Sequence, residues 1–547
     1  MRYVYMIVIA FFISLILFGC GIEGKIDNAS VRCEEKISEL FNHNYINGDF
    51  CLYSAQKGYE KINPSDGSKV SVFPITQVPE VNRAVSSARE AFKKWRKMSR
   101  VKRAEYFYEI AKIVEKRRDQ IANIISLETG KNINESIAEV NEALHMAQYA
   151  FGSGRMPQGE SVASEIEAKD SYMLRKPKGV VAIVSPFNFP VAIGAFWCAA
   201  PALVEGNTVV IKPSEDTPIS TMICAKIFDE AGIPPGVFNV IHGDGFTGDL
   251  LVRADVDHIC FTGSAEVGRH IRKVAAESWH KTTSCEMGSK SACIIFDDVE
   301  FNLALDSAIA SAFKLSGQRC VSSGRMIVQR SIYDEFAKRF AIEAGKLKTG
   351  NPFKSNLGSS GCPDGMVWEE LVPNEDIYYG PIINQQGFDK IRYFNKKVED
   401  DPRAEVILPP IYTGSGKSYY SSPMVYKSEW RDAGYLKNEV FGPHVAIIPF
   451  DTIEDAIRIY NDTEYGLAVG ILTNDFRKAR VMRDECDAGM IYWNGGSIAA
   501  ESHLAFGGVK KSGNGFPSAA RTFRAVTHEI SWTVNHADRL TFPQGMK

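Results

Sequence analysis

The stretch GVVAIVSPFNFP (residues 179–190) contains the clearest strand signal in this 547-residue chain. Val180 to Val184 is an unbroken apolar run, which is typical of a strand buried on both faces of a parallel sheet. A proline and an asparagine follow and predict a loop. NTVVIKPSEDTP (207–218), GVFNVIHGDG (236–245) and HICFTGSAEVG (258–268) repeat the same rhythm of strand and polar loop.

Strands that alternate with helices in this way predict a doubly wound α/β fold. Ligands of such sheets bind beyond the carboxyl ends of the strands. The loops that begin at Ser185, Lys212, Gly243 and Thr262 are therefore the candidate binding loops. A second series of strands, from SACIIFDD (291–298) to AGMIYWNGG (488–496), predicts a second α/β domain.

Composition is that of an ordinary soluble globular protein, with 45% hydrophobic and 24% charged residues. A formal net charge of −3 provides no global field that would favour nucleic acid. The basic segment Arg89 to Arg118 has helical spacing and is interpreted as solvated faces of amphipathic helices. The 11 cysteines are dispersed without a CxxC pair, which predicts neither a zinc site nor a disulfide framework and fits a reducing compartment.

The N-terminus indicates a different compartment. Residues 1–20, MRYVYMIVIAFFISLILFGC, contain an apolar run that suits a signal-peptide core or a lipoprotein signal. The alternative is a start codon assigned too early. If residues 1–20 are retained they are the only expected membrane contact, as an anchor; otherwise we expect a cytoplasmic protein. Residues 21–44 are predicted to be a linker, and residues 354–376 a surface loop insertion.

Three residues could carry catalytic chemistry. Cys320 in SGQRCVSSGR lies beside Arg319, and a nucleophilic cysteine needs nearby positive charge or N–H groups. Glu286 in SCEMGSKSA lies among small and apolar residues, which raise a carboxyl pKa toward that of a general base. Asn188 in SPFNFP could donate its amide to an oxyanion. Taken singly, each has a plain alternative: a packing cysteine, a capping or ion-paired glutamate, and a turn asparagine.

Two loops could bind a dinucleotide. FTGSAEVG (261–268) would place backbone N–H groups at a helix N-terminus, which suits an anion, although its glycine spacing departs from G-x-G-x-x-G. An ordinary strand-to-helix turn would explain it equally well. Lys212 and Glu215 follow a buried strand where a ribose would lie, and a surface salt bridge is the alternative.

PFNFP, GNTVVIKPSE, FTGSAEVG, CEMGSKS, GQRC, NEVFGP and FGGVKKSG occur in this order. Together they resemble the signatures of the NAD(P)-dependent aldehyde dehydrogenase superfamily, from about Tyr45 to about His536. The resemblance implies an α/β fold with a Rossmann-type NAD-binding domain (45–158 and 179–283), an α/β catalytic domain (284–505) and a small β projection for oligomerisation (159–178 and 514–536). It also implies a homodimer or homotetramer that acts on a small aldehyde, including semialdehydes, and no nucleic-acid partner.

The resemblance assigns roles to these residues. Cys320 becomes the nucleophile that attacks the aldehyde, Asn188 an oxyanion donor, and Glu286 the base for hydrolysis of the thioester to the carboxylic acid. The implied cofactor contacts are Pro186, Phe187, Lys212, Glu215, Gly243, Thr262, Gly263, Ser264, Gly288, Glu439 and Phe441. No metal is implied. NAD is expected and NADP is the alternative, because the Glu215 carboxylate would repel a 2′-phosphate.

Two departures from the family pattern lie near the site. Ser289 replaces the second glycine of a GG pair, and its side chain is expected to press on the cofactor or to shift Glu286. Ala505 replaces a proline. Two other functions stay open: an acylating dehydrogenase that passes the thioester to coenzyme A, which Glu286 argues against, and a catalytically silent relative, which the presence of Cys320, Glu286 and Asn188 together argues against.

Overall fold

The computed structural model describes residues 43–52, 58–354, 371–414 and 416–539. All of these residues lie in one compact unit, within Lys36–Lys547.

Several predicted segments lie wholly or mostly outside the described residues: the signal or anchor at 1–20, the linker at 21–44 and the insertion at 354–376. The last two residues of the predicted linker, His43 and Asn44, belong to a strand. At the described edges of the insertion, Phe353 bridges to Pro373. Within the described part of the chain, none of the helices is long and apolar enough to cross a membrane.

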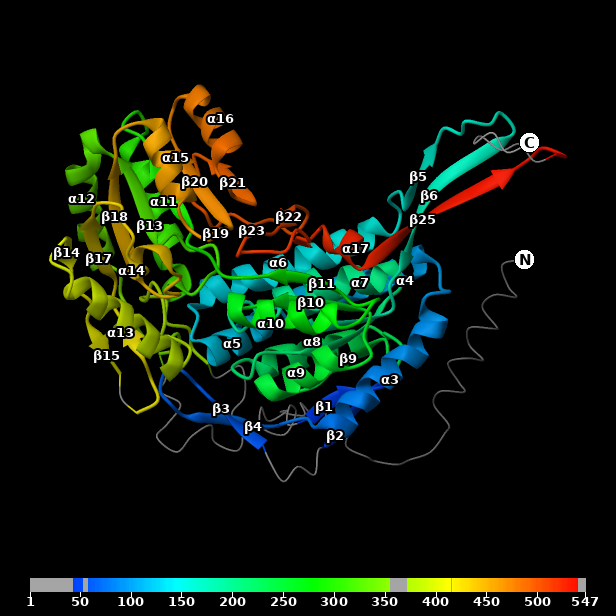
Figure 1. Cartoon of the computed structure of the whole chain (residues 1–547). Coiled ribbons are helices and arrows are strands. Elements are labelled where there is room, and N and C mark those ends of the chain that lie inside the picture. The colour runs from blue at the N-terminus through cyan, green and yellow to red at the C-terminus, as the bar shows by residue number, and fades with distance from the viewer. Residues whose placement is uncertain (1–42, 53–57, 355–370, 415, 540–547) are drawn as a thin grey trace, which may run out of the picture. The chain divides into compact units, whose positions relative to one another are not determined.

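Seven strands form the first sheet, in the order β11-β10-β7-β8-β9-β1-β2 (Figure 1). Their bounds are β1 His43–Ile46, β2 Asp49–Leu52, β7 Val180–Val184, β8 Thr208–Lys212, β9 Phe238–Val240, β10 His258–Thr262 and β11 Thr282–Glu286. The five strands from β11 to β9 are parallel, as predicted from their sequence rhythm. At the edge of the sheet, β1 pairs antiparallel with β9 and with β2. The alternation of strands and polar loops did not predict these two strands.

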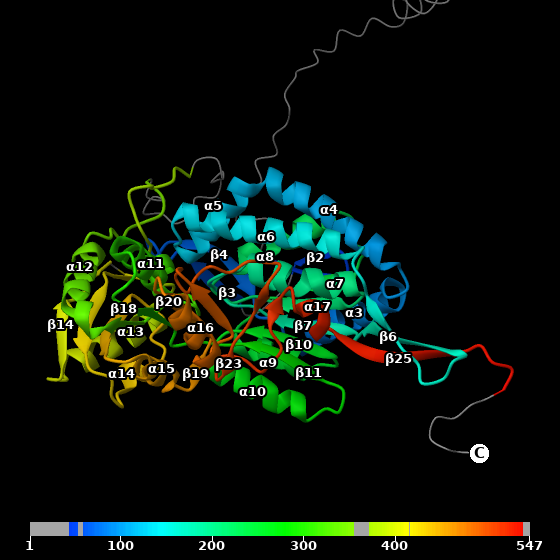
Figure 2. The same cartoon turned by 90° about the horizontal axis from the view of Figure 1, so that it is seen from above.

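Both faces of this sheet are buried, and strand β7 shows why its sequence is apolar throughout. Val181 and Ile183 pack into one hydrophobic cluster, and Val180 and Ala182 into another on the opposite face. The first cluster includes residues from α4 Arg100–Lys116, α5 Arg118–Thr129, α6 Ile133–Ser153, η1 Ala192–Ala199, α7 Ala200–Glu205 and α8 Pro218–Glu230. The second includes residues from α3 Val78–Trp95, α9 Gly245–Arg253 and α10 Ala265–Ala276 (Figure 2).

A second seven-stranded sheet has the order β14-β17-β18-β13-β12-β20-β21. Its strands are β12 Ala292–Ile295, β13 Arg325–Gln329, β14 Ala404–Leu408, β17 Met424–Ser428, β18 His444–Phe450, β20 Ala468–Leu472 and β21 Met490–Trp493. All neighbours are parallel except β14 and β17. Helices α11 Phe301–Phe313 and α12 Tyr333–Gly345 cover one face, and α13 Gln385–Glu399, α14 Gly434–Lys437, α15 Ile453–Asn461 and α16 Phe476–Glu485 cover the other.

A three-stranded antiparallel sheet extends from the first sheet (Figure 1). Its strands are β5 Gly159–Val162, β6 Lys169–Pro177 and β25 Thr527–Asn535, and β25 pairs with β6 along its whole length. Trp532 of β25 is 55% exposed. These strands lie within the ranges predicted for oligomerisation, although the range 514–536 also includes β24 Ser518–Ala519 and α17 Thr522–Ala525. Their role in assembly stays a prediction.

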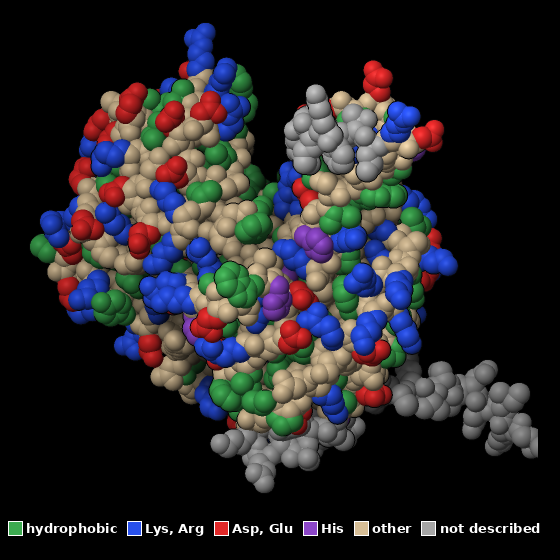
Figure 3. Space-filling model, turned by 45° about the vertical axis from the view of Figure 1, so that its right-hand side comes forward, with side chains coloured by type: hydrophobic (Ala, Val, Ile, Leu, Met, Phe, Trp, Pro, Cys, Tyr) green, Lys and Arg blue, Asp and Glu red, His purple; other side chains and the backbone are tan. Residues whose placement is uncertain are grey.

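Short elements complete the fold. They are the hairpin β3 Gly58–Ile62 and β4 Lys69–Pro74, the two-residue strands β15 Tyr412–Thr413, β16 Tyr420–Ser421, β19 Tyr465–Gly466, β22 Ala505–Phe506 and β23 Val509–Lys510, and the 3₁₀ turns η2 Lys314–Gly317 and η3 Arg330–Ile332. On the face seen in Figure 3, basic and acidic side chains are interspersed, in keeping with a formal net charge of −3.

Candidate active site

A cavity of about 750 Å³ lies where β7, β8 and β10 end. Its walls include the residues that directly follow these strands, as expected for an open parallel sheet. The predicted site residues that line it are Pro186, Phe187, Asn188, Lys212, Glu215, Thr262, Gly263, Ser264, Gly288, Cys320, Glu439 and Phe441. Gly243 and Glu286, also described, are not among its lining residues.

Lys212 and Glu215 occupy one part of the wall. Lys212 Nζ lies 3.5 Å from the Glu215 carboxylate, and the two side chains are 4% and 50% exposed. Lys212 and Glu215 therefore form an ion pair and also line the cavity, so the salt bridge does not exclude a role in binding a ribose. Lys212 Nζ also donates to the Gly243 carbonyl at 2.9 Å, so Gly243 supports the lysine from behind the wall. Burial lowers the pKa of Lys212, and Glu215 acts in the opposite direction.

The first turn of α10 forms another part of the wall. Ser264 is its N-cap, and its hydroxyl accepts a hydrogen bond from the Val267 N–H at 3.3 Å. Ser264, Glu266 and Val267 all line the cavity. The FTGSAEVG loop therefore presents a helix N-terminus to the cavity, which is an arrangement suited to an anionic group.

Glu439 is held against the backbone of residues 288–289. Its Oε1 accepts a hydrogen bond from the Ser289 N–H at 2.7 Å. A Cβ placed on Gly288 would lie only 2.2 Å from Glu439 Oε2, so this close approach requires glycine. Burial raises the pKa of the Glu439 carboxyl, while Lys390 acts to lower it.

Cys320 follows a tightly wound turn. Leu315, Ser316 and Gly317 have φ values of 53°, 56° and 71°, which the first two, as non-glycine residues, rarely adopt. The next carbonyl, that of Gln318, accepts a hydrogen bond from Asn188 Nδ2 at 2.9 Å. This bond joins the loop that carries Asn188 to the loop that carries Cys320, although the two residues are far apart in sequence.

Cys320 is half-buried and lines the cavity. Burial raises its pKa to about 12, and the carboxylates of Glu439 and Glu286 contribute to the rise. The backbone N–H groups of Cys320 and Val321 act in the opposite direction. The Arg319 guanidinium, whose positive charge was expected beside the thiol, pairs with Glu135 at 3.2 Å.

Glu286 ends β11 and is only 4% exposed. Burial raises its pKa well above the ordinary value, against the effect of backbone hydrogen bonds from Gly508 and Ser518. Its Oε2 has no hydrogen-bond partner among the described residues. The carboxyl therefore has the raised pKa that its sequence neighbours predict. It contacts the loop from Gly507 to Ser518, and its charge also acts on the Cys320 thiol.

Ser289, one of the departures from the family pattern, is buried at the same place. Its hydroxyl donates a hydrogen bond to the Cys320 carbonyl and lies 2.9 Å from Ser291 Oγ. The hydroxyl is directed at the backbone of Cys320, and an effect of this side chain on the cofactor or on Glu286 stays a prediction. The other departure, Ala505, is exposed and pairs with Ala519.

Sequence reasoning missed part of the cavity lining. The start of α13 contributes Gln386, Gly387 and Lys390, and α9 and α10 contribute Asp249 and His270. His270 Nε2 lies 2.6 Å from Asp249 Oδ1, which links α9 to α10. Nothing in the local sequence of α13 marks it as a cavity wall, because its position depends on the packing of the second sheet.

The model of the aldehyde dehydrogenase family matches residues 52–531, which is most of the chain. The chain belongs to the aldehyde dehydrogenase family. It is 33% identical over 478 residues to the α-ketoglutaric semialdehyde dehydrogenase of Bacillus subtilis (86% of this chain, 93% of the relative). It is 32% identical over 478 residues to human 4-trimethylaminobutyraldehyde dehydrogenase (86% and 92%). A solved structure, betaine aldehyde dehydrogenase from Staphylococcus aureus in complex with NAD+, superposes with a TM-score of 0.83 at 28% identity (92% and 96%).

The family resemblance, the α/β fold and the class of reaction are thereby confirmed. This aldehyde dehydrogenase is an NAD(P)-dependent oxidoreductase that oxidises an aldehyde by cysteine chemistry.

Proposed function

We propose that Cys320 is the nucleophile of this aldehyde dehydrogenase, with Asn188 as oxyanion donor and Glu286 as the base for hydrolysis. The observation that carries the assignment is the 2.9 Å hydrogen bond from Asn188 Nδ2 to the Gln318 carbonyl. It holds the amide and the thiol on adjoining loops, and both residues line the same cavity.

The cavity also fits a nicotinamide dinucleotide. Lys212 and Glu215 would hold the adenosine ribose, the N-terminus of α10 would hold the pyrophosphate, and Glu439 would hold the nicotinamide ribose. The absence of a side chain on Gly288 keeps Glu439 close to the backbone. Bound there, the cofactor would supply the hydride acceptor and a positive charge near the thiol.

The chain's own residues then divide the reaction into two halves. The Cys320 thiol gives up its proton to water, and the thiolate attacks the carbonyl carbon. The new oxyanion accepts hydrogen bonds from the Asn188 amide and the Cys320 N–H. Loss of hydride leaves a thioester on Cys320. Glu286 takes a proton from water, the hydroxide attacks the thioester carbon, and the carboxylic acid leaves as the C–S bond breaks.

The nucleophile is tested by Cys320→Ser. We expect loss of both the burst of NADH and steady-state turnover, because a serine hydroxyl has too high a pKa to replace the thiolate here. Cys51→Ser, at another half-buried free cysteine, is the matched control and should keep full activity. Undiminished NADH production by the Cys320 variant would overturn the assignment.

NAD is proposed as the preferred form of the cofactor. The half-exposed Glu215 carboxylate would place a negative charge beside a 2′-phosphate. Wild-type kcat/KM should therefore be higher with NAD than with NADP, and Glu215→Gln should narrow the difference. Equal kcat/KM values for wild-type enzyme would reject the preference.

A semialdehyde is the proposed substrate. The name of the Bacillus relative supports it, whereas the human relative is named for a cationic aldehyde. Initial rates of NADH formation with a panel of semialdehydes, trimethylammonium aldehydes, and simple aliphatic and aromatic aldehydes test the proposal. Highest kcat/KM on any class other than semialdehydes would reject it.

Assembly as a homodimer or homotetramer is proposed through the sheet β5-β6-β25. Most residues of β25 are exposed in the single chain, and the Trp532 ring, 55% exposed as a residue, packs on Tyr172 with ring centroids 5.9 Å apart. Mass measurement in solution by light scattering should give a multiple of the chain mass for wild-type protein. Trp532→Asp should lower that mass, and an unchanged mass would locate the interface elsewhere.

Cytoplasmic location is proposed from the cysteine usage and the need for NAD, with membrane anchoring through residues 1–20 as the alternative. Mass spectrometry of the mature N-terminus, together with fractionation of cells, distinguishes the two.

A further inference from the structure

Two buried carboxylates one helical turn apart on α6 contact the two loops of the proposed catalytic centre. Glu135 and Glu139 are spaced i, i+4 and therefore lie on the same face of the helix. They are 4% and 0% exposed. The proposed mechanism uses neither of them, and buried acidic groups need a compensating partner. Their partners are the backbones that flank Cys320 and Asn188.

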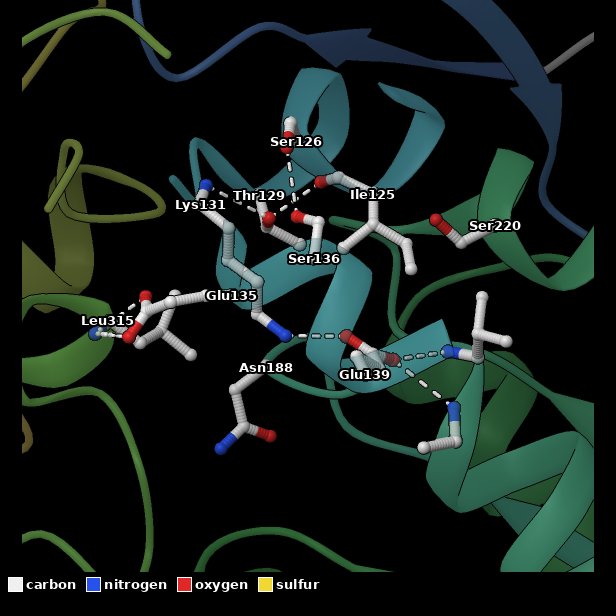
Figure 4. A network of polar contacts seen from close by, with 12 residues as sticks. Ile125, Ser126, Thr129, Lys131, Glu135, Ser136, Glu139, Asn188, Ser220 and Leu315 are labelled. Atoms are coloured by element: carbon white, nitrogen blue, oxygen red, sulfur yellow. Dashed lines mark hydrogen bonds and ion pairs between the residues drawn. The ribbon is translucent and has the colours of Figure 1, made fainter. Parts of the chain in front are cut away.

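Glu135 contacts the turn before Cys320. Both of its oxygens accept from the Leu315 N–H, at 3.0 and 3.1 Å, and Oε1 also accepts from Arg319 at 3.2 Å. Leu315 begins the left-handed turn, and Arg319 directly precedes Cys320. Figure 4 shows Glu135 directed from α6 at Leu315. The Glu135 carboxylate therefore stabilises the unfavourable left-handed turn by contacts at Leu315, where the turn begins, and at Arg319, which follows it.

Glu139 contacts the loop after Asn188. Its Oε1 accepts from the N–H groups of Val191 and Ala192, at 2.8 and 3.1 Å, where η1 begins. Its Oε2 lies 2.5 Å from Lys131 Nζ, and both of these side chains are fully buried (Figure 4). Glu139 thus fixes the start of η1, and with it the short loop that carries Asn188.

The cation partners of the two carboxylates meet on one aromatic ring. Lys131 Nζ lies 4.0 Å from the centre of the Phe189 ring, and Arg319 Cζ lies 5.2 Å from it. Phe189 follows Asn188 in sequence, so the loop with the amide and the loop with the thiol are joined on this ring as well as by the bond from Asn188 to Gln318. The i, i+4 spacing on α6 then sets the separation of the two loops.

We propose that Glu135 and Glu139 are positioning residues: Glu135 places the nucleophile Cys320, Glu139 places the oxyanion donor Asn188, and α6 holds the two in register. The proposal rests on the roles proposed above for Cys320 and Asn188. It predicts that Glu135 affects the placement of the thiol and Glu139 the stabilisation of the oxyanion, and that these effects can be measured separately. The two carboxylates lie on one helix, and their cation partners contact the same aromatic ring.

Two reactions separate the steps. Alkylation of Cys320 by iodoacetamide depends on the placement of the thiol but develops no carbonyl oxyanion. The pre-steady-state NADH burst with aldehyde depends on both the thiol and the oxyanion donor. Alkylation is followed by mass spectrometry of the Cys320 peptide, so it does not require a working dehydrogenase.

Glu135→Ala should slow alkylation and the burst alike, each by about tenfold, because the turn loses its charged acceptor. Glu135→Gln keeps an oxygen for the Leu315 N–H and should be milder in both. Glu139→Gln should slow the burst by about tenfold and leave alkylation within about twofold of wild type. Equal losses in both assays for Glu139→Gln, or an effect of Glu135→Ala on the burst alone, would overturn the proposal.

Glu128→Gln is the matched control for removing a buried charge. Glu128 is also fully buried and accepts from the Ile219 and Ser220 N–H groups at 2.7 Å, but it caps α8, which carries neither loop. For Glu128→Gln we expect a lower Tm, with the rates of alkylation and of the NADH burst at saturating cofactor near those of wild type. If Glu128→Gln slows both reactions as much as Glu135→Ala does, the effect of Glu135→Ala is general destabilisation rather than positioning. If Cys320→Ser leaves the NADH burst intact, the proposed role of Cys320 as nucleophile is wrong. That result is distinguishable from the results for the Glu135, Glu139 and Glu128 variants.

Discussion

The hydroxyl of Ser289 donates a hydrogen bond to the carbonyl of Cys320. The backbone N–H of the same residue donates to Glu439 at 2.7 Å. One residue thus connects the proposed nucleophile to the proposed nicotinamide-ribose contact, through its side chain on one side and its backbone on the other. A glycine at this position could make only the backbone contact.

Ser289→Ala should lower kcat by about fivefold, because one buried hydrogen bond to the Cys320 backbone is lost. The KM for NAD should stay within about twofold of wild type, because the N–H bond to Glu439 remains. Steady-state kinetics with varied NAD measures both. Ser291→Ala removes only the 2.9 Å contact with the Ser289 hydroxyl and is the control. A raised KM with unchanged kcat would show that Ser289 acts on the cofactor instead.

Gly288→Ala should weaken cofactor binding without removing any catalytic group. Its new Cβ would overlap the Glu439 carboxylate, with Cδ at 2.6 Å, so Glu439 must move away from the cavity backbone. We expect the KM for NAD to rise by about tenfold. Alkylation of Cys320 without cofactor should not become slower, and a large loss there would contradict the explanation. Gly152→Ala, at an exposed glycine outside the cavity lining where a Cβ meets no atom within 4 Å, is the control.

The pH dependence of Cys320 follows from its raised pKa of about 12. The thiol is protonated through the neutral range, so alkylation without cofactor should rise about tenfold per pH unit and show no plateau below pH 10. Glu439→Gln removes one of the charges that raise this pKa, so it should speed alkylation at pH 8 while it raises the KM for NAD. A plateau near pH 7 in wild-type enzyme would show that the thiol is already ionised.

A site residue could be predicted from the sequence when its own strand or helix places it in the cavity. It could not be predicted when its position depends on the packing of a distant part of the chain. Lys212, Glu215 and Ser264 were predictable because each follows an apolar strand, and the ends of parallel strands converge on one edge of the sheet. The walls from α13 were not predictable, because Gln386 and Lys390 reach the cavity only through the packing of the second sheet. The left-handed conformation of Leu315 carries no local signal either, since neither leucine nor serine favours it.

The carboxylates of α6 show a similar limit. Glu135 and Glu139 have ordinary helical spacing in sequence, and polar residues in helices are usually exposed. Their burial depends on the positions of η1 and of the Cys320 turn, which lie in later parts of the chain. Ser289 was recognisable as unusual from sequence alone, but the direction of its hydroxyl depends on where the Cys320 backbone lies.

Glu286→Gln should separate the two halves of the reaction. The first half needs the Cys320 thiol and the Asn188 amide, which this change leaves in place, so one equivalent of NADH per active site should still form in a burst. The second half needs a base, and an amide cannot accept a proton from water, so steady-state turnover should fall by about a hundredfold or more. Stopped-flow absorbance resolves the burst from the steady state.

The pH profile of turnover provides an independent check on Glu286. Burial raises its pKa, so the carboxyl is neutral below that pKa and becomes a base only as pH rises through it. Wild-type turnover limited by hydrolysis should therefore increase with pH, and Glu286→Gln should lose that increase while it keeps the burst. Glu277→Gln, at an exposed carboxylate, should behave as wild type. If the Glu286 variant instead loses the burst together with turnover, the carboxyl acts before the thioester forms, and its assignment as the hydrolytic base is wrong.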